Sequence, residues 1–312
     1  MNKKKQQRSA DFMLTLVVIC CGFSFFLTDI ATSDLEAFNL NAFRFIIAFI
    51  VGATIFNKKL HNVSRATLKW SLILGCILAI MYACMNLGVK YTTLSNSGFL
   101  CQTTVIVIPF LSAIINKTKP GLKVYIVAAI CMISVALLTL SNGFSINSSH
   151  IKGDIFCLVC GVAYAVHIVV TERVVNHPEV DLLQLSIIQL GTTGVISLLS
   201  CLVLETPHFP TVASTWAAAL FLSIMCTGFS FVIQTIAQKY TSASHVGVIF
   251  SLEPVIAGFV AFAFAGDVMT VQGYLGAILM VAGVFIMEID FKATPYTECF
   301  ATKLKEKDDD PS

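Results

Sequence analysis

Charged residues are scarce in this sequence. Asp, Glu, Lys and Arg make up 12% of its 312 residues and hydrophobic residues 56%, whereas soluble domains carry roughly 25% charged residues. A chain with so little polar side-chain surface cannot cover a water-soluble globule, so lipid is predicted to be the solvent for much of it. The net charge is only +2 and no Lys/Arg-rich face recurs along a helix, which argues against nucleic acid as a partner.

The motifs of common metal, redox and hydrolytic sites are also missing. Cys157 and Cys160 form one CxxC, but no second CxxC and no His pair accompanies it, and ten of the eleven cysteines lie in apolar runs. A thiol in such a run behaves as a small hydrophobe. No HExxH, paired-Asp motif or phosphate-binding glycine loop occurs. We therefore expect neither a metal nor a cofactor.

One partial match keeps an intramembrane enzyme as an alternative. Ser95-Asn-Ser-Gly98 resembles part of the Gly-x-Ser-Gly motif of membrane serine proteases, and His245 falls in another span. The leading Gly is missing, however, and both segments also fit an internal repeat described below. A channel or a receptor is a further alternative to a transporter.

Long apolar runs fill most of the chain. A helix needs about 20 mostly apolar residues to cross a bilayer, and ten runs approach or exceed this length. The connections between them are too short for a separate soluble domain. The predicted spans are Phe12–Thr28, Phe38–Phe56, Trp70–Gly88, Leu94–Ile115, Leu122–Leu140, Ile155–Val170, Leu182–Leu204, Thr215–Ala237, Ser244–Ala265 and Val271–Glu288.

Basic residues predict the orientation of these spans. Of the 20 Lys and Arg residues, 17 fall in segments that are cytoplasmic if the N-terminus is inside, Lys90 and Lys152 fall on the other side, and Arg44 lies within a span. Cytoplasmic loops carry this excess of positive charge. Both termini are thus predicted inside, in a multi-pass protein of the cell (plasma or inner) membrane. The first span resembles a signal peptide, but we interpret it as a retained helix because many spans follow.

The two halves of the chain resemble each other. Lys90–Gly98 aligns without gaps on Lys239–Gly247 with five of nine residues identical, and Cys21–Phe25 aligns on Cys160–Tyr164. Each half has five spans, and an odd number means that the second half enters the membrane from the opposite side. Inverted repeats of this kind are common in transporters.

The fold class predicted is therefore an all-α integral membrane protein, with ten transmembrane helices arranged as two inverted five-helix repeats. The predicted segments are a cytoplasmic N-terminus (1–10), a first repeat (11–140), a second repeat (153–290) and a charged, disordered cytoplasmic tail (291–312).

This organisation resembles the EamA-type permeases of the drug/metabolite transporter superfamily. The residues that carry the resemblance are Phe43-Arg44-Phe45, the Lys-Tyr-Thr turns at 90 and 239, Ser251-Leu-Glu-Pro254 and the segment Gly276–Gly283. The chain departs from the family pattern in having Cys21-Gly22 where Trp-Gly is usual. Val105 also stands where the fourth span usually has Pro, and Pro109 follows four residues later.

The resemblance implies a central cavity surrounded by spans one, three, four, six, eight and nine. Polar and aromatic residues of these spans are candidates for binding a small zwitterion or an amphipathic metabolite, although packing between helices also recruits such side chains. The candidate substrate-binding residues are Phe23, Tyr82, Asn86, Gln102, Tyr164, His167, Gln234, Phe250 and Glu253.

Two charged residues stand within spans, where charge is costly. Glu253 is the tenth residue of its span, about 15 Å along the helix, and Pro254 beside it removes a backbone hydrogen bond. It is interpreted either as a cavity-lining site for an amine or a proton, or as a protonated structural group. Arg44 is interpreted as structural, reaching the membrane interface or bonding backbone carbonyls.

The predicted function is transport of a small metabolite, most simply an amino acid or a related compound, by alternating access and in the direction of export. A multidrug exporter of the same fold is the second possibility. The predicted partners are the small-molecule substrate and the lipid bilayer.

Overall fold

The computed structural model describes residues 3–92, 94–115, 120–139, 151–265 and 270–289. These residues form helices and short turns, with no strand among them. The helices are α1 (Lys3–Thr32), α2 (Ala37–Ile55), α3 (Asn57–Leu60), α4 (Arg65–Tyr91), α5 (Leu94–Cys101), α6 (Thr104–Ile115), α7 (Leu122–Thr139), α8 (Ile151–Val174), α9 (Leu182–Leu204), α10 (Ala213–Phe221), η1 (Leu222–Phe229), α11 (Ser230–Gln238), α12 (Ala243–Phe250), α13 (Glu253–Val260), η2 (Ala261–Ala265) and α14 (Val271–Ile289).

Seven helical stretches are long and apolar enough to cross a membrane: Gln6–Thr32, Ala37–Ile55, Arg65–Tyr91, Ile151–Val174, Leu182–Leu204, Ala213–Gln238 and Ala243–Phe264. Three shorter apolar stretches accompany them: Phe99–Ile115, Leu122–Leu137 and Val271–Met287. All ten overlap spans predicted from the sequence. The chain is thus a multi-pass helical membrane protein.

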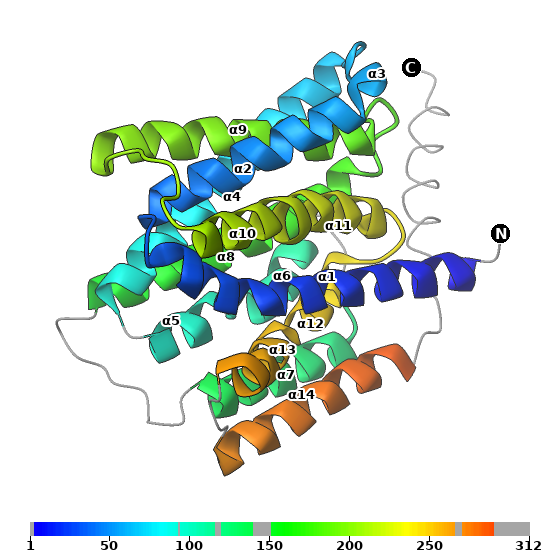
Figure 1. Cartoon of the computed structure of the whole chain (residues 1–312). Coiled ribbons are helices and arrows are strands. Elements are labelled where there is room, and N and C mark those ends of the chain that lie inside the picture. Colours follow the sequence, from blue (N-terminus) through cyan, green and yellow to red (C-terminus); the bar gives the residue numbers. More distant parts are fainter. Residues whose placement is uncertain (1–2, 93, 116–119, 140–150, 266–269, 290–312) are drawn as a thin grey trace, which may run out of the picture.

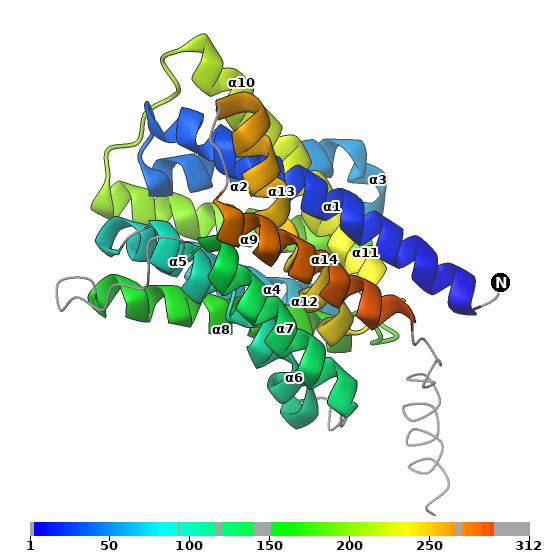
Figure 2. The ribbon, with the colours of Figure 1, turned by 90° about the horizontal axis from the view of Figure 1, so that it is seen from below.

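The long helices run roughly along a common direction (Figure 1). α7 packs against α14 at one edge of the bundle, and α2 packs against α9 at the opposite edge, with α1, α8 and α11 between them. Seen from below, α6, α7 and α14 lie on the near side (Figure 2). The predicted tail, residues 291–312, lies outside the described residues, as do Thr93 and residues 116–119, 140–150 and 266–269.

Polar side chains cap the N-termini of several helices. The Asp181 carboxylate accepts hydrogen bonds from the backbone of Leu183 (2.9 Å) and Gln184 (3.0 Å) at the start of α9. The Ser64 hydroxyl accepts one from the Thr67 backbone (3.0 Å) at the start of α4. Both bonds satisfy backbone donors that have no partner within a helix, which explains why these helices start where they do.

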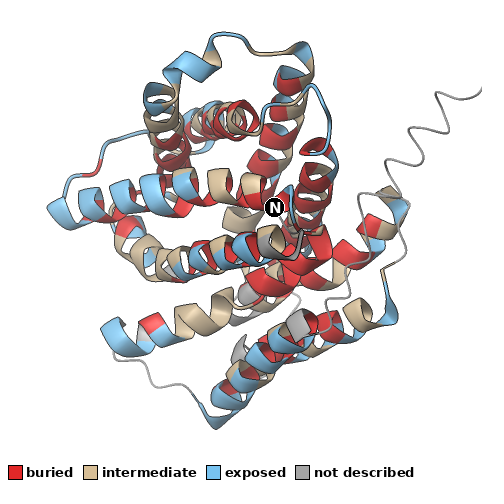
Figure 3. Ribbon diagram, turned by 90° about the vertical axis from the view of Figure 1, so that its right-hand side faces the viewer, coloured by how far each residue is buried: buried red, intermediate tan, exposed pale blue. Residues whose placement is uncertain are grey.

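Buried residues gather where the helices face one another, and exposed residues cover the outside (Figure 3). Many of the exposed side chains are apolar: Ile55, Ile114, Val195 and Phe259 are all more than half exposed. In water this surface would be an aggregation liability. Against lipid it costs nothing, which agrees with the low charge content of the sequence.

Two of the predicted spans differ from uniform α-helix in ways that the sequence did not indicate. Ala213–Gln238 contains a π-helical stretch, η1, and a second one, η2, follows α13. A π-helix adds residues to a turn and changes the direction in which the following side chains point. η1 lies against α1 and α2, so this change occurs inside the bundle.

Candidate functional site

The site is built around two interruptions in apolar helices. The predicted fourth span, 94–115, is not continuous, because α5 ends at Cys101 and α6 begins at Thr104. The ninth is interrupted between Phe250 and Glu253. Gln102 and Ser251, at the two breaks, are separated by the same 149 residues as Lys90 and Lys239. The interruptions therefore fall at equivalent positions of the internal repeat.

Threonine hydroxyls mark the first interruption. Thr103 donates to the Leu100 carbonyl (2.7 Å), and Thr104 donates to the carbonyls of Cys101 and Gly161 (both 2.9 Å). Backbone bonds here also span three residues instead of four, as from Val105 to the Gln102 carbonyl (3.1 Å). Side-chain bonds of this kind compete with the helical ladder. The predicted continuous helix is wrong at this point for that reason.

At the second interruption, Pro254 has no backbone N–H to donate. The Ser251 hydroxyl bonds back to Val248 (2.6 Å), and the Leu252 backbone donates to Ile249 (3.1 Å). Here the structure has the loosened turn that Pro254 predicted. α13 starts at Glu253, so the carboxylate of this residue lies at a helix N-terminus, where negative charge is favoured.

Arg44 is the basic side chain within electrostatic range of Glu253, although the two form no direct ion pair. The two side chains interact electrostatically, and Cys21 and Tyr164 also lie within the electrostatic reach of Glu253. Arg44 is only 5% exposed. Its Nε donates a 3.2 Å hydrogen bond to the Thr227 hydroxyl in η1, and its guanidinium carbon lies 5.7 Å from the centroid of the Tyr82 ring.

Arg44 was predicted to extend to the membrane interface or to bond backbone carbonyls, and the hydrogen bond that the structure gives it goes to a side-chain hydroxyl instead. The Arg44 side chain is buried between α2, α4 and η1, and its hydrogen-bond partner is a hydroxyl. A guanidinium has five donors, and one of them is assigned to Thr227. The remaining donors give Arg44 the capacity to bind a carboxylate as well as to hold the helices together.

A chain of rings connects Arg44 to the second helix break. Neighbouring ring centroids are 4.8 to 6.3 Å apart, the range of ordinary ring–ring packing. The rings follow the order Tyr82, Phe45, Phe231, His167, Tyr164 and Phe250. Four of the predicted site residues are thereby brought together, from α4, α8 and α12. We call these six rings the aromatic chain.

His167 carries the polar atoms at the middle of the aromatic chain. Its ring is 1% exposed, and Nε2 lies 3.2 Å from the side-chain oxygen of Gln189 on α9. If Nε2 donates this bond, Nδ1 is an acceptor. Among the described residues, neither His167 Nδ1 nor the Gln189 amide nitrogen has a hydrogen-bond partner. Buried polar atoms without partners are uncommon, so water or a ligand is expected at this place.

Two further predicted residues have the same property. The side-chain nitrogens of Asn86 on α4 and Gln234 on α11 are buried and lack a partner in the described part of the chain. Each is a hydrogen-bond donor. Together with Gln189 they supply amide donors next to an aromatic surface, the combination predicted for a small polar or amphipathic ligand.

Phe23 and Gln102 lie apart from the aromatic chain. Phe23 lines a lateral cavity of about 500 Å³, and its ring lies 5.9 Å from that of Phe264. Gln102 is half-buried at the first helix break. Phe23 is thus a residue of the lateral cavity, whereas Gln102 marks an interruption.

Both cavities lie toward the sides of the bundle. The 500 Å³ cavity is lined by α1, α10 and Phe264, and is almost entirely apolar. The 310 Å³ cavity is lined by α2, α4 and α9, and includes Asn41 and Ser197. Neither is lined by Tyr82, His167 or Glu253. These three residues therefore lie outside both cavities.

Sequence reasoning missed Gln189, Phe45, Phe231 and Thr227. Gln189 and Phe45 belong to the seventh and second spans, which the resemblance leaves outside the cavity. The signal available was the presence of a Gln in a run of apolar residues, which is costly unless the amide is satisfied. Among the described residues, no group of three or more His, Cys, Asp or Glu side chains could hold a metal ion.

Interrupted apolar helices, two charged residues within spans and a mixed aromatic and amide surface define the class of protein as a polytopic helical membrane protein with an intramembrane polar site. The chain belongs to the EamA-like transporter family, which matches residues 8–140 and 151–289 as two repeats.

Sequence relatives agree with this assignment, and a solved structure agrees with the fold. An uncharacterized transporter of Archaeoglobus fulgidus is 25% identical over 88% of this chain and 95% of its own length. The uncharacterized transporter YoaV of Bacillus subtilis is 21% identical over 79% of this chain and 82% of its own. A crystal structure with 18% identity superposes with a TM-score of 0.79, covering 90% of this chain and 96% of that one, which supports the fold.

Proposed function

We propose that this membrane transporter moves a small zwitterion, in the first instance an amino acid or a related metabolite, out of the cell by alternating access. The observation that carries the proposal is the electrostatic interaction of the buried Arg44 with the half-buried Glu253, close to the aromatic chain. A guanidinium suits a carboxylate and a carboxylate suits an ammonium group. Transport, not catalysis, is the proposed activity.

The unpartnered polar atoms support the same substrate class. The nitrogens of Asn86, Gln189 and Gln234 and the Nδ1 of His167 offer hydrogen bonds that water or a polar solute can satisfy. The rings of Tyr164 and Phe250 offer an apolar surface next to them. A solute with two charged ends and a short apolar body matches these groups.

We propose that ten helices cross the membrane as two inverted repeats. Helix pairing supports this: α2 packs on α9, α7 on α14 and α6 on α12, and each pair joins equivalent spans of the two halves. A superposition of residues 10–140 on 153–290 tests the arrangement. It requires a rotation axis in the membrane plane, and an axis along the membrane normal would contradict it.

In the proposed orientation the protein lies in the plasma or inner membrane, and both of its termini face the cytoplasm. The support is the distribution of 17 basic residues against two. In the structure α3, with Lys58 and Lys59, lies at the same end of the bundle as the N-terminus (Figure 1). Reporter fusions at the 57–69 loop and the C-terminus test this, and activity of a C-terminal reporter only outside would contradict it.

A multidrug exporter is the second candidate. The 500 Å³ apolar cavity beside Phe23 and Phe264 favours it, because this cavity offers a lipophilic cation a route of entry from the lipid. The two candidates predict different roles for Phe23 and Arg44. Phe23→Ala should impair drug export alone, whereas Arg44→Gln should impair amino-acid transport.

The decisive experiment is a transport assay with the purified protein in liposomes. A panel of labelled amino acids is compared with lipophilic cations, and intracellular and medium metabolites are compared in cells with and without the protein. We expect exchange of one or more amino acids that Arg44→Gln abolishes. Exchange of lipophilic cations alone would favour the second candidate, and exchange of no solute would contradict both.

A further inference from the structure

A buried pair of ionisable side chains lies away from the aromatic chain. The Asp11 carboxylate on α1 is 3.2 Å from Nε2 of His245 on α12. Asp11 is 8% exposed and His245 1%. A buried carboxylate is costly unless a partner compensates its charge. Asp11 and His245 therefore join two helices that are far apart in the sequence, and the proposed substrate site does not use them.

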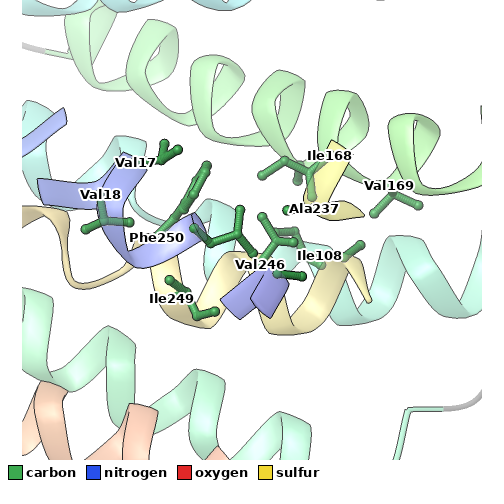
Figure 4. Close-up of a cluster of buried hydrophobic side chains, with 13 residues drawn as sticks. Val17, Val18, Ile108, Ile168, Val169, Ala237, Val246, Ile249 and Phe250 are labelled. Carbon is green, nitrogen blue, oxygen red and sulfur yellow. The ribbon is translucent and has the colours of Figure 1, made fainter. Parts of the chain in front are cut away.

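This pair lies at one end of an apolar cluster that separates it from the aromatic chain. In the cluster Val17 and Val18 of α1 meet Val246, Ile249 and Phe250 of α12 (Figure 4). Residues of α6, α8 and α11 complete it, among them Ile108, Ile168 and Ala237. We call this cluster the apolar plug.

The plug extends from the site toward the cytoplasm in the proposed orientation. Phe250 belongs to the plug and also stacks on Tyr164 of the aromatic chain, with centroids 6.2 Å apart. His245 precedes Phe250 by five residues, or about 7.5 Å along a helix. Asp11 precedes Cys21, which lies near Glu253, by ten residues, or about 15 Å. The Asp11–His245 pair thus closes the plug at its cytoplasmic end.

Among the described residues, one more acidic group and one amide lie near this pair. Glu172 of α8 is buried and accepts a 3.1 Å hydrogen bond from the Ala243 backbone at the start of α12. Gln238 of α11 donates to the Ile168 carbonyl (3.1 Å). The basic groups of the adjoining helices, Arg8 on α1, Arg173 on α8 and Lys239 after α11, are exposed, and α6 contributes no charged residue.

We infer that Asp11 and His245 form a proton-dependent latch that holds the cytoplasmic end of the transporter closed. With His245 protonated and Asp11 ionised, opposite charges attract across the α1–α12 contact. When the Nε2 or Nδ1 proton leaves for cytoplasmic water, the ring becomes neutral and a buried carboxylate loses its compensation. α1 then separates from α12, and water enters the plug. This inference rests on the proposed alternating access.

The repeat provides an internal comparison. His245 belongs to the repeated segment 239–247, and its counterpart, 90–98, contacts a different aspartate: Thr92 donates a 2.6 Å hydrogen bond to Asp154 on α8. A threonine hydroxyl does not titrate between pH 5 and 8, whereas histidine does. The latch therefore makes the cytoplasmic end sensitive to pH between about 5 and 8, whereas the Thr92–Asp154 contact includes no histidine.

Amide hydrogen exchange of the full chain in phospholipid nanodiscs tests the latch without any substrate. Exchange in residues 12–20 and 243–250 is measured from pH 5.5 to 8 and corrected for the intrinsic pH dependence of amide exchange. We expect corrected exchange to accelerate about tenfold or more between the two extremes, because local opening exposes these amides. Exchange in residues 86–92 and 153–160 should stay constant.

Two uncharged variants of similar size distinguish an effect of the latch from a general loss of stability. Asp11→Asn and His245→Gln should exchange fast in these segments at every pH, while Asp29→Asn, at the exposed far end of α1, should behave as wild type. A pH-independent wild type would overturn the inference, as would faster exchange spread equally over α7 and α14. If a variant does not fold, the wild-type pH series decides alone. The exchange experiment needs no solute. Its result can therefore be interpreted even if the transport assay detects no substrate.

Discussion

The Nε of Arg44 on α2 donates a 3.2 Å hydrogen bond to the hydroxyl of Thr227, inside the π-helical stretch η1. Both side chains are buried. The bond ties a charged group within the membrane to the one stretch of its partner helix that departs from α-helical geometry. A π-helix is frequently found at a functional site, and here it turns a hydroxyl toward the guanidinium.

This bond predicts the effect of Thr227→Val, which keeps the shape of the side chain and removes the acceptor. The buried charge of Arg44 then loses a hydrogen bond, which costs about 1.5–3 kcal/mol in the free energy of unfolding. Thermal unfolding in detergent measures it. Thr235→Val is the matched control, because the buried Thr235 hydroxyl bonds only within its own helix, to Phe231 (2.8 Å). Equal losses in both variants would contradict the assigned role of Thr227.

Glu253→Gln tests the charge pair from the other side. Gln keeps the size and hydrogen-bonding capacity of the side chain but cannot titrate or balance Arg44. We expect transport to fall about tenfold, the change that corresponds to about 1.4 kcal/mol, or to lose its dependence on pH, with melting temperature and expression unchanged. Glu179→Gln, on an exposed loop, is the control and should transport normally.

A purely structural role for Glu253 predicts the reverse pattern. Glu253→Gln would then be tolerated, and Glu253→Ala would lower the melting temperature because a partner loses its bond. Unchanged transport and an unchanged pH profile in a well-expressed Glu253→Gln protein would remove this residue from the mechanism.

Asp34, in the turn between α1 and α2, predicts a pH dependence at the end of the bundle opposite the N-terminus. Its carboxylate accepts hydrogen bonds from the Thr211 hydroxyl and backbone N–H, both 2.7 Å. These bonds hold the pKa of Asp34 below its usual value. The stabilisation they give is present above the ordinary Asp pKa of about 3.9 and is lost as the pH falls through the lower folded value.

We therefore expect the 205–212 loop to loosen in acid, below about pH 4. Amide exchange of Thr211 measures this in wild type and in Asp34→Asn, which should exchange fast at neutral pH as well. Asp29→Asn, on an exposed position nearby, is the control. A loop that stays equally protected in wild type and Asp34→Asn at pH 7 would contradict the role of this carboxylate.

Gly153 predicts a packing defect. A Cβ at this position would lie 2.5 Å from the backbone nitrogen of Thr92 and the backbone carbon of Tyr91, and backbone atoms cannot move aside cheaply. Gly153→Ala should therefore lower the free energy of unfolding by about 1–3 kcal/mol. At Gly121 a Cβ meets nothing within 4 Å, so Gly121→Ala should stay within about 0.5 kcal/mol of wild type. Thermal unfolding of the two variants compares them.

Much of the architecture is local in origin and could be predicted from the sequence. Membrane insertion follows from the length and composition of the apolar runs, because a bilayer has one thickness and tolerates few charges. The family follows from motifs kept in order along the chain. The interruption at Pro254 also follows locally, since a proline has no N–H whatever surrounds it.

The other interruption could not be predicted in this way. Threonines occur in many uninterrupted helices. Here the hydroxyl of Thr104 bonds to the Gly161 carbonyl, which belongs to a different helix. The π-helical turn at Thr227 depends likewise on its packing against α1 and α2. Such partners come from distant parts of the chain, so the sequence around each threonine contains no signal of the break.

The sequence alone determined which polar residues enter the membrane, and it singled out Glu253, Tyr82 and His167 among them. Only the tertiary structure decided their partners: Gln189 for His167, and Asp11 for His245. The physical reason is that a helix in lipid forms all of its backbone hydrogen bonds internally. Whether a segment forms a helix can therefore be predicted from its own residues. The rotation of that helix about its axis, and with it the direction of each side chain, is set by packing against neighbouring helices.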